Sequence, residues 1–541
     1  MHTLLSKKMH YNFKIEHCCR CGLNQQVFCD TILPIYFSTK GRTKMSKTLI
    51  ESVFEETLKY LECMPKEKRK EIGQFFTSVE TARFMASMFN APQNETISVL
   101  DPGAGSGVLT AAIIDKLQNN TKTKLINVTC YENNVDVLPI LKRNLDFIKQ
   151  NSAIPVEYRV IEDNYLTTQS KDFNSNNCNS EKYDWVIGNP PYKKILKDAI
   201  EATSMPSVCY GAPNLYFLFT AMGLFNLKKD GELVFIIPRS WTSGAYFQHF
   251  RNYLFENGTL KQIHLFVSRD KVFEKESVLQ ETIIIKIDKS SEKNDIKITC
   301  SNSNSDFQNI SSMVVPYYNV VIGEEKYVYL ITTQEELEVL QTVNRFKNTL
   351  PSLGLKMRTG ITVDFRNREH LRNEPEKNAV PLLYAQHIQN GKVVFPIEKE
   401  FQYITTERQG LIQRNKNYLL VKRFTAKEEK RRLQCGVYLS CNLQEYDWIS
   451  TQNKINFIEG KDCDISEELV YGLYVIFNST IYDQYYRILN GSTQVNSTEV
   501  NTIPVPKLNE IKKLGTIFME QNNHSVHTCD EILGEFLNGK I

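Results

Sequence analysis

The stretch VLDPGAGSGVL, residues 99–109, decides the fold of the N-terminal half of the chain. An apolar run ends at Asp101, three glycines (Gly103, Gly105 and Gly107) follow, and the apolar spacing of GVLTAAIIDKL then predicts a helix. Glycines let such a turn approach a ligand closely and leave the first N–H groups of the helix available to bind it. The spacing differs from the dinucleotide pattern, and no Lys-Ser/Thr pair follows as in a triphosphate-binding loop. A purely structural turn is the alternative.

Strand-like and helix-like runs alternate around this turn, from about residue 95 to 290. Such alternation is typical of an α/β fold with a mainly parallel sheet. Seven strands are expected, which make one complete sheet. They are Ile97–Leu100, Leu125–Tyr131, Val156–Ile161, Asp184–Ile187, Glu232–Ile237, Ile263–Val267 and Thr282–Ile287.

Acidic residues end the second and third predicted strands. Glu132, in VTCYENN, is placed to accept hydrogen bonds from the hydroxyls of a ribose. The alternative is an acid at the start of the next helix, where negative charge is favoured. Asp163, in RVIEDNYL, could accept from an adenine amino group, although Asp-Asn is also ordinary turn chemistry. With the glycine turn, these acids predict a nucleoside cofactor at the carboxyl edge of the sheet.

The fourth predicted strand leads into Asn189-Pro190-Pro191-Tyr192, where two prolines end the strand in a stiff turn. The glycine turn followed by this motif, in this order, resembles the gamma-class N6-adenine DNA methyltransferases, the TaqI-like and PstI-like enzymes of bacterial restriction–modification systems. GQFFTSVETARFMASMF, residues 73–89, resembles the leading segment of that family, which more often has Thr-Pro where this chain has Thr77-Ser78.

The resemblance implies a Rossmann-like fold that binds S-adenosylmethionine, with a seven-stranded, mainly parallel sheet. No metal site is predicted, because the chain has only one CxxC pair, Cys18 and Cys21, and no second pair follows at a finger-like spacing. The residues that the resemblance places around the cofactor are Thr77, Asp101, Gly103, Gly105, Gly107, Glu132 and Asp163.

The resemblance also implies the chemistry at the target base, an adenine rotated out of duplex DNA. The side-chain oxygen of Asn189 and the carbonyl of Pro190 would each accept one hydrogen of N6, while Pro191 keeps the turn stiff. Tyr192 would stack on the base. Phe273, in DKVFEKESVLQETIIIKI, would be a second clamp, and a core aromatic is the alternative reading of it.

Beyond an Asn/Ser-rich segment at residues 289–312, which is expected to be a domain boundary, the chain is richer in short strand-like runs, Tyr and basic residues. We therefore expect a catalytic domain at residues 46–290 and a DNA target-recognition domain at residues 313–541. NGSTQVNSTEVNTIPVP resembles the closing segment of specificity domains in PstI-like enzymes. Four cations in LLVKRFTAKEEKRRLQ are candidate phosphate contacts, with a solvated face as the alternative: Lys422, Arg423, Arg431 and Arg432.

The remaining features of the chain set its context. Thirteen cysteines, an odd number, predict reduced thiols and a cytoplasmic setting without a membrane. Residues 1–45 form an uncharacterised extension with a single CxxC pair, Cys18 and Cys21, and a start at Met45 would leave it untranslated.

About 70 residues before the first motif are too few for a nuclease domain. A stand-alone modification enzyme with a separately encoded endonuclease, or an orphan enzyme, is expected.

Rival functions share parts of these motifs. Asn-Pro-Pro-Tyr also occurs in enzymes that methylate a glutamine of release factors, and a variant of it occurs in ribosomal RNA methyltransferases, but those proteins lack a large C-terminal domain. N4-cytosine methyltransferases more often have Ser in place of Asn189. A DNA-binding module with a degenerate methyltransferase fold is the non-enzymatic alternative, and the intact glycine turn, Glu132 and Asn189 argue against it.

Overall fold

The computed structural model describes residues 47–65, 77–175, 181–266, 282–303, 306–426, 429–490 and 493–541. The N-terminal extension and the predicted clamp residue Phe273 lie outside the described residues. None of the helices in these ranges has the length and apolar character needed to cross a bilayer.

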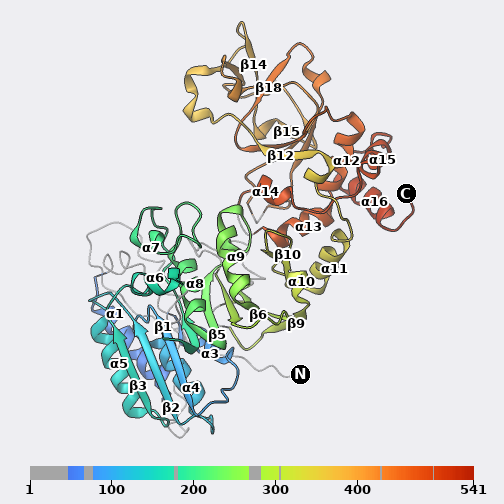
Figure 1. The fold of residues 1–541 in the computed structure, drawn as a ribbon. Coiled ribbons are helices and arrows are strands. Elements are labelled where there is room, and N and C mark those ends of the chain that lie inside the picture. The colour runs from blue at the N-terminus through green and yellow to red at the C-terminus, as the bar shows by residue number, and fades with distance from the viewer. Residues whose placement is uncertain are drawn as a thin grey trace, which may run out of the picture. The chain divides into compact units, whose positions relative to one another are not determined.

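A single sheet organises residues 96–315, with the strand order β3-β2-β1-β4-β5-β7-β6-β8-β9 (Figure 1). Strands β1 to β5 run parallel, and β7 is antiparallel to both β5 and β6. The seven predicted strands are confirmed, and their order is that of the S-adenosylmethionine-dependent methyltransferase fold. Their bounds are β1 Thr96–Pro102, β2 Leu125–Tyr131, β3 Val156–Ile161, β4 Tyr183–Gly188, β5 Leu227–Pro238, β6 Thr259–Phe266 and β7 Thr282–Asp288.

Two further strands extend the sheet, so the expected total of seven strands is wrong. β8 (Ile296–Ser301) pairs parallel with β6, and β9 (Ser311–Val315) pairs antiparallel with β8. β8 lies within the Asn/Ser-rich segment at residues 289–312 that was expected to be a domain boundary, and β9 begins at the end of that segment. The short run IKIT gains its partner through pairing with β6, which lies some thirty residues earlier in the chain, and the run MVV pairs in turn with β8.

Helices cover both faces of this sheet (Figure 1). Consecutive strand residues point to opposite faces, so Val99 belongs to the core under α1, α3, α4 and α5, whereas Leu100 belongs to the core under α6, α8 and α9. The helices are α1 Leu49–Glu62, α3 Val79–Ser87, α4 Val108–Leu117, α5 Leu138–Asn151, α6 Tyr165–Ser175, α7 Ile200–Thr203, α8 Leu215–Asn226 and α9 Gln248–Asn257.

Replacing Gly107 with alanine is expected to lower the free energy of unfolding by about 1–2 kcal/mol. Gly107 precedes α4 with φ of 85°, and a Cβ there would lie 3.2 Å from a methyl of Leu141. Gly410→Ala is the matched control, because a Cβ at Gly410 meets nothing within 4 Å. Denaturant unfolding of both variants measures the difference, and equal stabilities would contradict the strain that we assign to this turn.

Residues 355–460 form two further sheets of short strands (Figure 1). The first has the order β12-β22-β19-β20-β16-β15, and the second β13-β17-β14-β21-β18. The first comprises Leu355–Thr359, Ile455–Gly460, Tyr418–Lys422, Cys435–Tyr438, Lys392–Val393 and Ile388–Gln389. The second comprises Leu371–Arg372, Tyr403–Thr405, Ala379–Leu383, Trp448–Thr451 and Gln413–Arg414, each set given in the order of its sheet.

Helices complete the C-terminal region. They are α10 Tyr317–Val320, α11 Gln334–Val343, α12 Glu467–Phe477, α13 Thr480–Leu489, α14 Ser497–Val500, α15 Leu508–Met519 and α16 Val526–Leu537. The chain from Thr48 to Ile541 forms one compact unit. The division into a catalytic domain at 46–290 and a recognition domain at 313–541 therefore stays a prediction.

Candidate active site

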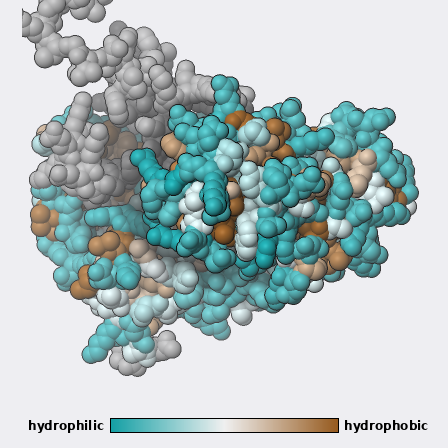
Figure 2. Space-filling model, turned by 90° about the horizontal axis from the view of Figure 1, so that it is seen from above, coloured by the Kyte–Doolittle hydropathy of each residue, from teal (hydrophilic) through white to brown (hydrophobic). Residues whose placement is uncertain are grey.

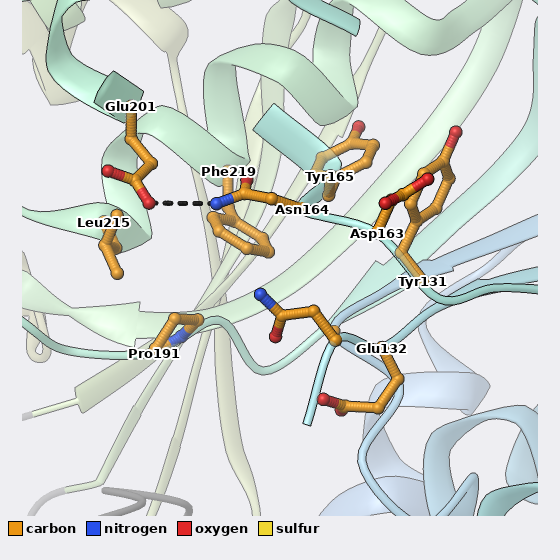
Figure 3. A pocket seen from close by; sticks show the side chains of 11 residues that line it. Tyr131, Glu132, Asp163, Asn164, Tyr165, Pro191, Glu201, Leu215 and Phe219 are labelled. Atoms are coloured by element: carbon orange, nitrogen blue, oxygen red, sulfur yellow. Dashed lines mark hydrogen bonds between the residues drawn. The ribbon is translucent and has the colours of Figure 1, made fainter. Parts of the chain in front are cut away.

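A pocket lies at the carboxyl edge of the sheet (Figure 3). Residues that follow four neighbouring strands line it: Gly103 after β1, Glu132 after β2, Asp163 after β3 and Pro191 after β4. It holds about 490 Å³ of empty space and is open to solvent. Strand order reverses between β1 and β4, and ligands of open α/β sheets bind at such a point. The other lining residues are Tyr131, Asn133, Asn164, Tyr165, Glu201, Leu215 and Phe219.

The glycine turn forms one wall of this pocket. All three predicted glycines have positive φ, 84° at Gly103, 56° at Gly105 and 85° at Gly107. The N–H of Gly103 donates to the carbonyl of Tyr131 at 2.8 Å, which fixes the turn to β2. A Cβ at Gly103 would lie 3.5 Å from the ring of Phe219, so the glycine keeps the gap between turn and ring open.

Glu132 both anchors the turn and lines the pocket. Its Oε2 accepts from the N–H of Gly105 at 3.0 Å, and its Oε1 accepts from the N–H of Asn134 at 2.8 Å. The side chain is buried, and burial raises the pKa of the carboxyl. The helix-start alternative does not match this geometry, because α5 begins only at Leu138. Each oxygen of Glu132 keeps a second lone pair for a ligand, and its contact with a ribose stays a prediction.

Asp163 is exposed at the rim of the pocket, beside a hydrogen-bonded pair that the sequence analysis missed. Asn164 accepts from the N–H of Leu166 at 3.0 Å at the start of α6, and its Nδ2 donates to Glu201 Oε1 at 2.9 Å (Figure 3). Glu201 lies on α7, which follows the Asn-Pro-Pro-Tyr turn. The pair therefore ties the segment after β4 to the end of β3.

The apolar wall was also missed. Leu215 and Phe219 lie four residues apart on α8 and so share one helix face, and Pro191 lies on the pocket as well. The helical spacing of NLYFLFTAMGLFNL could have placed Leu215 and Phe219 on one face. It could not show which face meets a ligand, because α8 is apolar on nearly all sides.

The carboxamide of Asn189 is held from two sides. Its Nδ2 donates to Thr77 Oγ1 at 3.2 Å, and the hydroxyl of Tyr192 lies 2.9 Å from its Oδ1. The same hydroxyl lies 3.0 Å from the carbonyl of Ile236 on β5, and its single proton serves one acceptor at a time. Burial raises the pKa of Tyr192, so it stays a neutral donor. The structure thus brings together Thr77 of the leading segment with Asn189 and Tyr192 of the Asn-Pro-Pro-Tyr motif.

Asp101 lies beneath the turn and is not among the residues that line the pocket. It is fully buried at the end of β1, where its Oδ2 accepts from Thr110 Oγ1 at 2.9 Å. Its Oδ1 has no hydrogen-bond partner among the described residues. Burial raises the pKa of this carboxyl to about 7.

Asp101→Asn is expected to flatten the pH dependence of stability. Because the pKa is about 7 in the folded state against 3.8 for a free carboxyl, the stability that the protonated Asp101 contributes is complete below about pH 4 and lost as the pH rises through 7. The Asp101→Asn variant should not show this loss of stability with rising pH, which in the wild type is at most a few kcal/mol. Melting temperatures from pH 4 to 8 measure it, with the exposed Asp295→Asn as control. Parallel profiles for wild type and Asp101→Asn would contradict this account.

Two of the four candidate DNA-binding cations are held inside the fold. Arg432 is 1% exposed, and its backbone N–H donates to Asp483 at 2.7 Å. Arg431 donates to the carbonyls of Asn478 and Ser479, at 2.7 and 2.9 Å, where α12 ends. A buried guanidinium cannot reach a phosphate, so Arg432 is not carried forward as a DNA contact, and the Arg431 guanidinium has a structural role at this helix end.

The other two cations are at the end of β19. Lys422 and Arg423 are both half-buried. The guanidinium of Arg423 donates to the carbonyl of Asn453 at 3.0 Å and to Gln494 Oε1 at 3.3 Å, which fixes its direction.

Comparison with known proteins identifies the family. Residues 74–273 match the family described as Eco57I restriction-modification methylase. The type II methyltransferase M.BsuBI of Bacillus subtilis is 34% identical over 468 residues, which cover 84% of this chain and 91% of that protein. The type II methyltransferase M.PstI of Providencia stuartii is 34% identical over 457 residues, which cover 82% of this chain and 89% of that protein.

These matches span both the residues around the pocket and most of the C-terminal region, so they concern the whole enzyme and not only its fold. They confirm the resemblance drawn from the glycine turn and Asn-Pro-Pro-Tyr. The chain belongs to the restriction–modification methylases and is a type II methyltransferase of the kind represented by M.BsuBI and M.PstI.

Proposed function

We propose that the enzyme transfers the methyl group of S-adenosylmethionine to N6 of an adenine that is rotated out of duplex DNA at a specific sequence. The observation that carries the proposal is the oriented carboxamide of Asn189 near the pocket at the carboxyl edge of the sheet. A separately encoded endonuclease that cuts the same sequence is the expected partner of such an enzyme.

The pocket suits the chemistry of this cofactor. Glu132 offers carboxylate oxygens to ribose hydroxyls, and Asp163 offers an acceptor to the adenine amino group. Phe219 and Leu215 offer flat and aliphatic surfaces to the adenine ring. The gap at Gly103, which a Cβ would narrow, gives the ligand room beside the turn. S-adenosylmethionine, when bound, supplies a methyl group activated by a sulfonium.

The chain's own contribution at the target amine is to align and polarise it. The lone pair of N6 is delocalised into the ring of adenine, which makes the amine a poor nucleophile. Asn189 Oδ1 and the carbonyl of Pro190 accept its two hydrogens, favour a pyramidal nitrogen and stabilise the positive charge that develops there. No strong general base is needed, because the methylated ammonium is acidic. Thr77 and Tyr192 act as positioning residues that hold the amide in place.

Mass spectrometry of nucleosides tests the reaction. Unmethylated plasmid DNA is incubated with the enzyme and S-adenosylmethionine, and long-read sequencing of the product maps the modified positions. N6-methyladenine at one short recurring sequence is expected. N4-methylcytosine, or an unmodified product from folded enzyme that binds the cofactor, would refute the proposal.

A further inference from the structure

Four loop segments meet at one end of the six-stranded sheet. In the antiparallel pairings Thr359 lies opposite Asn456, and Lys422 lies opposite Ile455, so β12 and β19 end where β22 begins. The segments at this end are residues 360–366, 423–425 and 452–454, together with residues 493–495 of the C-terminal segment. We refer to them together as the loop platform.

Backbone hydrogen bonds join the four segments. The N–H of Asn453 donates to the carbonyl of Thr362 at 2.8 Å, and the N–H of Arg423 donates to the carbonyl of Lys454 at 2.9 Å. The N–H of Val495 donates to the carbonyl of Arg423 at 2.7 Å. A surface whose loops are tied in this way loses little conformational entropy when it binds a partner.

Two aromatic rings stand out of this platform into solvent. Phe365 is 63% exposed and Phe424 is 47% exposed. Each has the guanidinium of a neighbouring arginine over its ring, Arg366 at 5.5 Å from Phe365 and Arg423 at 5.6 Å from Phe424. Elsewhere, the face seen in Figure 2 shows hydrophobic residues as small separate areas among hydrophilic ones. Two exposed aromatic–arginine pairs thus lie on adjoining loops, where both rings are available to a partner.

The charge of the platform is positive. Its cations are Arg366, Arg423 and Lys454, of which Arg366 and Lys454 are exposed. Its one acid is Asp364, whose Oδ2 accepts from Gln452 Nε2 at 3.0 Å. Such a surface matches a polyanion whose grooves also present apolar groups at the base edges, such as the thymine methyl, which is the chemistry of duplex DNA.

The platform is also connected to the catalytic sheet. Gln494 shares the C-terminal segment with Glu499, which is fully buried. Glu499 accepts from Asn496 Nδ2 at 3.0 Å and from the side chain of Ser243, a few residues after β5. The carbonyl of Ile236, on β5, lies within reach of the Tyr192 hydroxyl. The C-terminal segment of the platform is therefore linked, through the end of β5, to Tyr192 and Asn189 of the candidate active site.

We propose that the loop platform is the surface that contacts duplex DNA for sequence recognition. Phe365 and Phe424 contact the bases, and Arg366 and Lys454 pair with phosphates or with base edges in a groove. This inference rests on the proposed function in one respect only, that the substrate is DNA.

The test compares Phe365→Ala and Phe424→Ala with wild type, using a labelled duplex that carries the methylated sequence found by long-read mapping. Each variant should weaken binding roughly 5- to 100-fold, the range expected for one base–aromatic contact, while melting temperature and cofactor affinity stay unchanged. Tyr318→Ala is the matched control, because Tyr318 is a 70% exposed aromatic on α10, outside the platform. It should bind the duplex like wild type.

The salt dependence of binding separates the roles of the cations. Arg366→Gln should lower the slope of log affinity against log salt by about one if the guanidinium pairs with a phosphate, or relax sequence preference if it reads a base. Wild-type affinity in both phenylalanine variants, or an equal loss in Tyr318→Ala, would overturn the proposal. These readouts measure binding, so they remain decisive even if the methylated atom proves not to be N6 of adenine.

Discussion

Replacing Asn189 with alanine is expected to lower kcat by about 100- to 1,000-fold, the effect of losing one preorganised acceptor at a site of developing charge. Affinities for S-adenosylmethionine and for duplex DNA should remain close to those of wild type. The amide interacts with N6 most strongly as positive charge appears on the nitrogen, so its loss acts on the transition state. Single-turnover methylation rates, with calorimetric and anisotropy titrations, separate the two quantities.

Asn257→Ala is the matched control for this change. Asn257 is an exposed asparagine whose Nδ2 donates to the carbonyl of Tyr253 in the last turn of α9. The Asn257→Ala substitution also removes a carboxamide, but away from the pocket, so this variant should keep the wild-type kcat. A rate in Asn189→Ala within a few-fold of wild type would refute the role assigned to the amide.

Glu132→Ala is expected to raise the dissociation constant of S-adenosylmethionine by about 10- to 100-fold, which corresponds to the loss of one hydrogen bond to a charged group. The loss has two physical sources. The carboxylate can no longer accept from the ribose, and the N–H groups of Gly105 and Asn134 lose the acceptor that shapes the turn. Calorimetry measures the first effect, and thermal unfolding of the free protein reports the second.

Glu162→Ala provides the comparison for Glu132. Glu162 is an exposed acid after β3 that pairs with Lys142 and does not line the pocket. It should bind the cofactor like wild type. Normal cofactor affinity in Glu132→Ala, together with a lowered melting temperature, would restrict Glu132 to anchoring the turn.

Much of the catalytic sheet could be predicted because its signals are local. The turn at Gly103 to Gly107 and the prolines after β4 impose their backbone geometry within a few residues. The three strand ends that carry Gly103, Glu132 and Asp163 then meet at one edge because parallel strands share their carboxyl ends.

Features that depend on distant parts of the chain could not be predicted. The charged residues around Arg432 in the sequence are typical of a surface segment, but Asp483, 51 residues later, accepts from its backbone N–H, and the side chain is buried. The contact between Asn164 and Glu201 joins positions 37 residues apart, so neither pattern alone reveals it. The pairing of β8 with β6 likewise joins two segments that are far apart in the sequence.

The hydroxyl of Tyr192 can change from one hydrogen-bond acceptor to another when a target base binds. Its O–H bond can point to Asn189 Oδ1 or to the carbonyl of Ile236, which lie at 2.9 and 3.0 Å. Under the proposed function, an adenine amine would donate to Asn189 Oδ1 while the O–H of Tyr192 turns to the carbonyl of Ile236, so Asn189 Oδ1 would have a donor both before and after the base binds. A base that carries a carbonyl in place of the amine has no proton to offer, and Asn189 would keep its tyrosine donor. Under the proposed function, adenine would therefore bind here in preference to hypoxanthine, which carries a carbonyl at that position.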